Sequence, residues 1–136
     1  MKPIIHQYGY YGKGESDLKE LFKWLTLNNG LLLDIRTTAK SQWLPHWNKK
    51  QLVEALPSMY AHLPEWGNVN YREKGTIKIA NPSMGLAKFE RLLEDNSPRA
   101  HIVVMCACKY YDKCHRKVIL NFLASKGYVI DIEPIL

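Results

Sequence analysis

The sequence predicts an α/β protein with three layers, in which a mostly parallel sheet lies between helices. Segments with a strand pattern alternate along the chain with segments whose apolar residues recur at helical spacing. Two strand segments, 31–36 and 101–105, are almost continuously apolar, which is typical of parallel strands buried on both faces. Parallel strands need crossovers, and crossovers are right-handed almost without exception. Helices are therefore expected on both faces of the sheet.

The first third of the chain predicts a strand, a helix and a second strand. Residues 4–8 form a short strand that leads into a glycine-rich turn. Asp17 is expected to cap the next helix, which carries apolar residues on one face and stops at 28–30. Residues 31–36 then form a buried strand whose polar end reaches the carboxyl edge of the sheet.

The rest of the chain repeats this order. Residues 49–56 predict a helix that Pro57 ends, and residues 59–63 predict a short strand. Segment 68–83 allows no assignment. The remaining expected elements are a helix over 86–93, a strand over 101–105, a helix capped by Asp112 and ended by Gly127, and a last strand over 128–132.

Length and composition predict one globular domain over residues 1–136. A chain of 136 residues can bury a core without disulfides or a structural metal. Hydrophobic residues make up 46% and charged residues 24%, which is the ordinary globular balance. No apolar run reaches the length of about 18 residues that spans a membrane, and the first residues do not resemble a signal peptide. We therefore expect a cytoplasmic protein without a membrane partner.

The charge balance favours an anionic ligand. Nineteen Lys and Arg against thirteen Asp and Glu give a formal net charge of +6. Such a charge favours encounter with small phosphorylated ligands, and nucleic acid is an alternative partner. The sequence does not predict an oligomeric state.

Candidate site residues follow the predicted strands, because open parallel sheets bind ligands beyond the carboxyl ends of their strands. Four such ends carry polar, aromatic or thiol side chains: Tyr8, Gly9 and Tyr10; Asp34 and Arg36; Glu65; and Cys106, which leads to Cys114, His115 and Arg116.

The region around Cys114 has the features of a thiolate or anion site. Cys114 is expected about two residues inside the predicted helix, where free N–H groups and the helix dipole stabilise negative charge. Its thiol pKa is therefore expected below the ordinary value. Arg116 in the first helical turn is unfavourable for the helix itself, which indicates an anionic partner. Alternatively, the cysteines are packing residues and Arg116 pairs with Asp34 or Glu65.

The same region offers metal ligands at an unusual spacing. The candidate ligands are Cys106, Cys108, Cys114 and His115. Zinc sites usually pair ligands two to four residues apart, whereas adjacent Cys114 and His115 would have to point the same way from one helical turn. We therefore expect no metal and no other cofactor.

An aromatic and basic loop follows Arg36. Segment 43–50 carries Trp43, His46 and Trp47, followed by Lys49 and Lys50, and such a mixture of aromatic and basic residues is found on surfaces that stack bases. The alternative is a loop that folds Trp43 and Trp47 onto the sheet.

These strand ends resemble those of a bacterial and archaeal family, known as domain of unknown function 488. The shared motifs are Gly9-Tyr10, Asp34-Ile35-Arg36, and Cys106 followed by Cys114-His115-Arg116. Segments 41–50 and 60–67 are also similar, so the resemblance covers almost the whole chain. It implies a compact three-layer α/β fold and one pocket that gathers the three motifs, but it implies no reaction. Cys108 stands where an acidic residue is expected, and Trp66 where a leucine is usual.

The leading hypothesis is an enzyme that acts on a phosphate-bearing or other anionic substrate derived from nucleotides or nucleic acid. Arg36 and Arg116 would clamp the anion from one shared cavity. Cys114 would be the thiolate, and Asp34 or His115 would carry the proton. The other candidates for ligand binding are Tyr8, Gly9, Tyr10, Glu65 and Cys106.

Two alternatives belong to other classes of function. One is a non-catalytic module that binds nucleotide or nucleic acid through the same pocket. The other is a redox or regulatory domain in which the three cysteines exchange disulfides.

Overall fold

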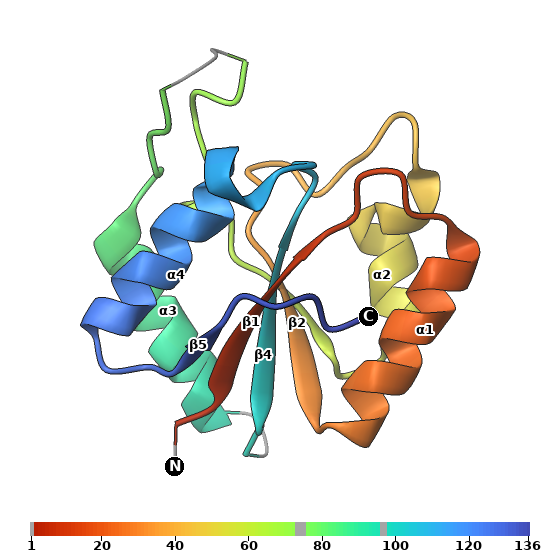
Figure 1. Ribbon diagram of the computed structural model, residues 1–136, viewed down its shortest axis with the longest axis horizontal. Coiled ribbons are helices and arrows are strands. Elements are labelled where there is room, and N and C mark those ends of the chain that lie inside the picture. Colours follow the sequence, from red (N-terminus) through yellow and green to blue (C-terminus); the bar gives the residue numbers. More distant parts are fainter. Residues whose placement is uncertain (1, 73–75, 96–97) are drawn as a thin grey trace.

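The computed structural model describes residues 2–72, 76–95 and 98–136, and it confirms the predicted α/β class. Within these residues the sheet has five strands, all parallel, in the order β3-β2-β4-β1-β5 (Figure 1). The strands are β1 (Ile4–Gly9), β2 (Gly30–Asp34), β3 (Tyr60–His62), β4 (His101–Cys106) and β5 (Ile130–Asp131). Non-consecutive neighbours mean that helical crossovers join the strands, as the sequence predicts.

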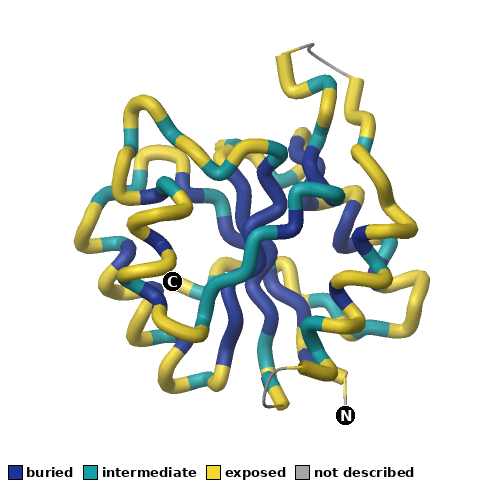
Figure 2. Tube along the Cα trace, turned by 180° about the vertical axis from the view of Figure 1, so that it is seen from behind, coloured by how far each residue is buried: buried dark blue, intermediate teal, exposed yellow. Residues whose placement is uncertain are grey.

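Helices cover both faces of the sheet, as predicted (Figure 1). α1 (Glu15–Leu27) and α2 (Lys49–Ala55) lie on one face, and α3 (Pro82–Asp95) and α4 (His115–Ser125) lie on the other. Each face has its own apolar cluster. The α1 side includes Leu21, Leu52 and Val103, and the α4 side includes Phe89, Val104 and Ile119. The three long strands are consequently buried on both faces, as the dark trace in Figure 2 shows.

The start of α1 differs from the sequence prediction. Gly14 is the N-cap, and its N–H donates to Asp17 Oδ2 at 2.7 Å. Asp17 is therefore the third residue of the helix and not its cap. A carboxylate at this position accepts a hydrogen bond from the N-cap N–H. The helix cap therefore lies three residues earlier than the sequence predicts.

The start of α4 also differs. Asp112 lies exposed in a 3₁₀ turn, Tyr111–Lys113, so it does not cap the helix. The N-cap is Cys114, whose backbone is extended (φ −108°, ψ 150°) and whose Sγ accepts the Arg116 N–H at 3.4 Å. The turn intervenes between β4 and α4 and moves the helix start by two residues. Cys114 is thus outside the helix and not two residues inside it.

The segment without a sequence assignment is partly ordered by Trp66. Asn68 forms an antiparallel bridge with Ile79, and α3 begins at Pro82, four residues before the predicted start. Trp66 Nε1 donates to the Pro82 carbonyl at 3.2 Å. A Cβ at Gly85 would lie 2.1 Å from that nitrogen, so only glycine allows this close packing.

Among the helices of the described residues, none combines the length and the apolar character needed to cross a membrane.

Acid should destabilise the fold through His6. This side chain is 5% exposed, and its Nε2 lies 2.7 Å from His101 Nδ1. Burial and then His101 lower the pKa of His6 below its ordinary value of 6.5, despite the opposite effect of Asp131. The unfolded chain therefore binds the proton first, and stability falls as the pH drops below 6.5 towards the lowered pKa.

We expect the change in urea midpoint from pH 7.5 to pH 5.5 to be less favourable in wild type than in His6→Gln; His115, whose pKa is raised to about 9, acts in the opposite direction but equally in both proteins. The exposed His46 provides the matched control, because His46→Gln should show the same change as wild type. An equal pH dependence in wild type and His6→Gln would contradict the assignment.

Candidate functional site

The carboxyl ends of β1, β2 and β4 meet at one edge of the sheet. The parallel register pairs Gly9 with Cys106 and Asp34 with Met105. Side chains that follow these strands therefore gather above the same edge, where the sequence places the candidate site.

Two cavities lie at this edge, and some of the predicted ligand-binding residues line one cavity while others line the other. The larger one has a volume of about 1190 Å³, and the smaller one about 330 Å³. The larger cavity is lined by Tyr10, Arg36, Thr37, Thr38, Lys40, Gln42, Asn68, Tyr71, Thr76, Ile77, Cys106, Ala107, Cys108, Asp112, Lys113 and His115. Of the predicted site residues, Tyr8, Gly9 and Arg116 line the smaller cavity.

The two arginines do not face one cavity as the sequence predicts. Arg36 lines the larger cavity and Arg116 lines the smaller one. Arg36 follows β2, whereas Arg116 lies in the first turn of α4, which covers the opposite face of the sheet from α1 and α2. The proposed double clamp on one anion is therefore wrong.

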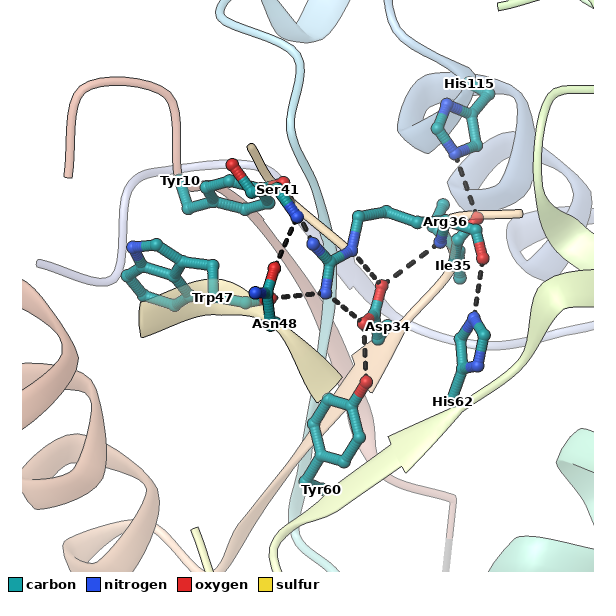
Figure 3. A network of polar contacts seen from close by, with 10 residues as sticks. All are labelled: Tyr10, Asp34, Ile35, Arg36, Ser41, Trp47, Asn48, Tyr60, His62 and His115. Atoms are coloured by element: carbon teal, nitrogen blue, oxygen red, sulfur yellow. Dashed lines mark hydrogen bonds and ion pairs between the residues drawn. The ribbon is translucent and has the colours of Figure 1, made fainter. Parts of the chain in front are cut away.

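Arg36 is held by a closed network around Asp34 (Figure 3). Its Nε and Nη2 donate to the two carboxylate oxygens of Asp34 at 2.8 and 2.6 Å. Its remaining contacts are Nη1 to the Tyr10 hydroxyl at 2.9 Å and Nη2 to the Trp47 carbonyl at 2.6 Å. The Tyr60 hydroxyl donates to Asp34 Oδ2 at 2.6 Å. Burial opposes the charge of Arg36, but hydrogen bonding to Asp34 raises its pKa.

This network gives Asp34 the geometry of a structural counter-ion. The residue is fully buried, lines neither cavity, and accepts the Arg36 backbone N–H as well. A proton carrier must reach a ligand, and nothing in this arrangement brings Asp34 to one. Glu65 also lies outside both cavities and forms an ion pair with Lys88, so it is not a counter-charge for either arginine.

The three cysteines and His115 form a compact cluster. One ligand atom from each residue lies within 4.8 Å of all the others. Cys106 Sγ is 2.7 Å from Cys114 Sγ, which is 3.7 Å from His115 Nδ1. His115 Nε2 lies 3.1 Å from the Ile35 carbonyl oxygen, which orients the ring (Figure 3).

The geometric objection to a metal site does not hold for this cluster. It assumed that Cys114 and His115 both project from a helical turn. Because Cys114 is an extended N-cap, its side chain leaves the chain in a different direction from that of a helical residue. Adjacent residues can then converge on one point, and these four residues are the set that could hold a metal ion.

Within the metal-free cluster, the thiolate is best placed on Cys114. A hydrogen bond from Cys106 is the main cause that lowers the pKa of Cys114, and His115 lowers it further. The direction agrees with the sequence prediction. Burial, together with hydrogen bonding to Cys108, raises the pKa of Cys106. Burial opposes the charge of His115, yet its hydrogen bonds to Cys108 and Cys114 raise its pKa to about 9.

Access to the thiols differs from the sequence prediction. Cys106 and Cys114 are each 1% exposed, whereas Cys108 is half-buried. Cys106, Cys108 and His115 line the larger cavity and Cys114 lines neither, so Cys108 is the most accessible of the three thiols to a ligand there.

Arg116 supplies the positive charge next to the thiolate. It is 2% exposed, and its Nε lies 3.3 Å from Cys114 Sγ. Its Nη1 donates to Gln7 Oε1 at 2.7 Å and its Nη2 to the Cys108 carbonyl at 3.0 Å. Its contacts with the described residues include no carboxylate, so sulfur is its anionic partner. Burial opposes its charge, while Cys106 and Cys114 raise its pKa.

Gly9 leaves the space that this arginine needs. A Cβ at Gly9 would lie 2.7 Å from Arg116 Nη1 and 2.6 Å from the Cys108 carbonyl oxygen. The Gly-Tyr motif at the end of β1 thus serves two networks, because Gly9 admits Arg116 and Tyr10 contacts Arg36.

The two tryptophans of the aromatic loop have different surroundings. Trp47 is fully buried and stacks on Tyr10, with ring centroids 5.2 Å apart and an interplanar angle of 14°. Trp43 is 84% exposed. The packing alternative is therefore confirmed for Trp47 and contradicted for Trp43.

Several lining residues were missed by the sequence reasoning. Thr37, Thr38 and Lys40 follow β2, so inspecting a longer stretch after that strand would have found them. The lining residues Asn68, Tyr71, Thr76 and Ile77 belong to the unassigned segment, and no sequence signal places them at this edge.

Comparison with known proteins gives one match. The model of the family described as domain of unknown function DUF488 matches residues 17–123. This range contains the Asp34 to Arg36 motif and the segment from Cys106 to Arg116, but it begins after Gly9-Tyr10. No curated protein and no solved structure matches the chain.

Removing the charge of Asp34 should be costly. Asp34→Asn leaves the buried Arg36 without its carboxylate, and breaking one partner of such a pair typically costs about 3–5 kcal/mol of unfolding free energy. Glu65→Gln is the control, because its pair with the more exposed Lys88 should contribute less than about 1 kcal/mol. Urea denaturation of both variants measures the difference. Equal losses would show that the Asp34 pair is not a structural element.

Proposed function

This chain belongs to the family of domains of unknown function DUF488, and we propose that it is an enzyme that acts on a phosphate-bearing or other anionic substrate. The substrate, a nucleotide or a nucleic-acid derivative, would bind in the larger cavity. The observation that carries the proposal is the position of the cysteine–histidine cluster, because Cys106, Cys108 and His115 line a cavity that is also lined by Lys40 and Lys113.

Cationic and hydroxyl groups favour an anion in this cavity. Lys40 and Lys113 line it, together with the hydroxyl groups of Thr37 and Thr38. Neither lysine forms an ion pair within the described part of the chain. Asp112 is the single lining carboxylate among the described residues. Because Asp34 neutralises Arg36, the lysines replace the arginines as the charges that attract the ligand.

The groups suited to chemistry lie at the same cavity. Thiols and an imidazole are nucleophiles, proton carriers or metal ligands, depending on what they hold. Cys106, Cys108 and His115 line the cavity, and the half-buried Cys108 is the most accessible of the thiols, whereas Cys114 contacts the buried Cys106 behind them. This arrangement supports a reactive centre next to a site for an anion, which is what an enzyme on a phosphate-bearing substrate requires.

A non-catalytic module that binds the same anions is the second candidate. The observation in its favour is Trp43, whose 84% exposure would suit stacking against a base. Both candidate functions require binding of the same anions, but only the enzyme converts them to product. The same compounds can therefore distinguish the two candidates.

Pyrophosphate should stabilise the protein through Lys40 and Lys113. We expect a rise in melting temperature with added pyrophosphate, and a loss of most of that rise in Lys40→Ala and Lys113→Ala. Lys23→Ala is the matched control, since this exposed lysine of α1 lines neither cavity and its removal changes the net charge equally. If all three variants respond equally, the stabilisation by pyrophosphate depends only on the net charge of the protein, and the proposed binding of anions in the cavity is contradicted.

Turnover is tested on nucleoside mono- and diphosphates and on short single-stranded oligonucleotides, with products separated by chromatography. Conversion by wild type and its loss in Lys113→Ala support an enzyme. Binding of these compounds without conversion would contradict it in favour of the binding module.

A further inference from the structure

We propose that Cys106, Cys108, Cys114 and His115 bind one zinc ion in a tetrahedral Cys₃His site at the floor of the larger cavity. This inference goes beyond the proposed function, because it depends on the cluster alone and not on the ligand of the cavity. With zinc bound, the three cysteines are metal ligands and not free nucleophiles, and His115 is a metal ligand and not a proton carrier, so the cluster would serve the proposed enzyme by holding the metal next to the cavity.

The spacing of the four ligand atoms fits one ion. Zinc lies about 2.3 Å from sulfur and about 2.0 Å from nitrogen, so the edges of a tetrahedral site measure about 3.5–3.8 Å. All four ligand atoms lie within 4.8 Å of one another, and Cys114 Sγ is 3.7 Å from His115 Nδ1. Cys106 Sγ and Cys114 Sγ, at 2.7 Å, must separate by about 1 Å, which side-chain rotation can supply.

His115 has the orientation of a zinc ligand. Histidines that bind zinc commonly donate their other ring N–H to a carboxylate or a backbone carbonyl, which fixes the tautomer. Here Nε2 lies 3.1 Å from the Ile35 carbonyl oxygen, and Nδ1 faces the sulfur atoms. The Ile35 carbonyl comes from the end of β2, so the sheet itself aims the imidazole at the three cysteines.

Arg116 balances the charge of the loaded site. Three thiolates and one Zn²⁺ carry a net charge of −1. The buried guanidinium group of Arg116 lies 3.3 Å from Cys114 Sγ, and its backbone N–H donates to the same sulfur at 3.4 Å. Arg116 has no carboxylate among its described contacts, so the anionic metal–thiolate centre would be the partner of its charge. A backbone N–H that donates to a sulfur atom, as that of Arg116 does, commonly supports zinc-bound sulfur.

The ligand types select the metal. Thiolate with imidazole favours zinc over magnesium or calcium, which prefer oxygen ligands. Zinc has no redox chemistry, and metal binding would hold Cys106 and Cys114 apart and prevent their oxidation to a disulfide.

The experiment begins with metal content. Protein purified under reducing conditions without chelator should contain about one zinc per chain by elemental mass spectrometry. After zinc is removed with a chelator, Co²⁺ should give the intense visible bands of a tetrahedral site and a thiolate-to-cobalt charge-transfer band. Zn²⁺ should then displace the cobalt.

The key variant is Cys108→Ser, because Cys108 is half-buried and its replacement leaves the apolar core intact. We expect a weaker charge-transfer band and an affinity for Co²⁺ lowered at least about tenfold. His46→Gln, an exposed histidine far from the cluster in sequence, should bind Co²⁺ as wild type does. Circular dichroism confirms that both variants are folded.

Three results would overturn the site: less than one tenth of a metal ion per chain with no cobalt bands, equal cobalt spectra in wild type and Cys108→Ser, or a Cys106–Cys114 disulfide in the reduced preparation. The pyrophosphate response is measured on zinc-loaded and chelator-treated protein. A response without metal binding overturns only the zinc site, and metal binding without a response overturns only the proposed substrate cavity.

Discussion

The buried guanidinium group of Arg116 has no carboxylate among its contacts with the described residues, so it needs another anion, and this requirement shapes the site around it. Its charge lies next to Cys114 Sγ and against the Cys108 carbonyl. A fixed positive charge at this position favours thiolate over thiol, whether the sulfur is free or bound to metal. The space for the guanidinium group depends on Gly9, and its direction depends on the first turn of α4. The end of β1, the turn after β4 and the start of α4 are thus fixed together.

The sheet keeps a second buried cation separate from the first. Arg36 is neutralised by Asp34 and enclosed by Tyr10 and Trp47, which belong to the apolar cluster on the α1 side. Cys106 and Cys114 belong to the cluster on the α4 side. Each arginine therefore has its own anion, and the larger cavity lies between a neutral ion pair and a cluster of sulfur atoms. Lys40 and Lys113 line this cavity, and the proposed binding of an anion depends on their charges.

The elements that sequence reasoning predicted well are those with a local cause. The mainly apolar runs at 31–36 and 101–105 predicted the strands Gly30–Asp34 and His101–Cys106, because a segment with so few polar side chains is stable only when both faces are covered. The helix at 49–56 ends before Pro57, which cannot continue it. The errors at Asp17 and Asp112 share another cause: an acidic residue near a helix start fits either the cap or a later position, and only the path of the preceding turn distinguishes them.

By itself, the sequence determined the class of fold and the edge of the sheet where polar residues gather, and it identified Cys106, Cys114, His115 and Arg116 as candidates there, because hydrophobic period and strand ends are local properties. The tertiary structure decided which of these residues meet. Arg36 pairs with Asp34, two residues away in the sequence. Arg116 contacts a cysteine sulfur and not Glu65, which pairs with Lys88. The four ligand atoms converged because Cys114 lies outside the helix. Such pairings depend on distances between segments remote in sequence, and packing of the whole sheet sets those distances.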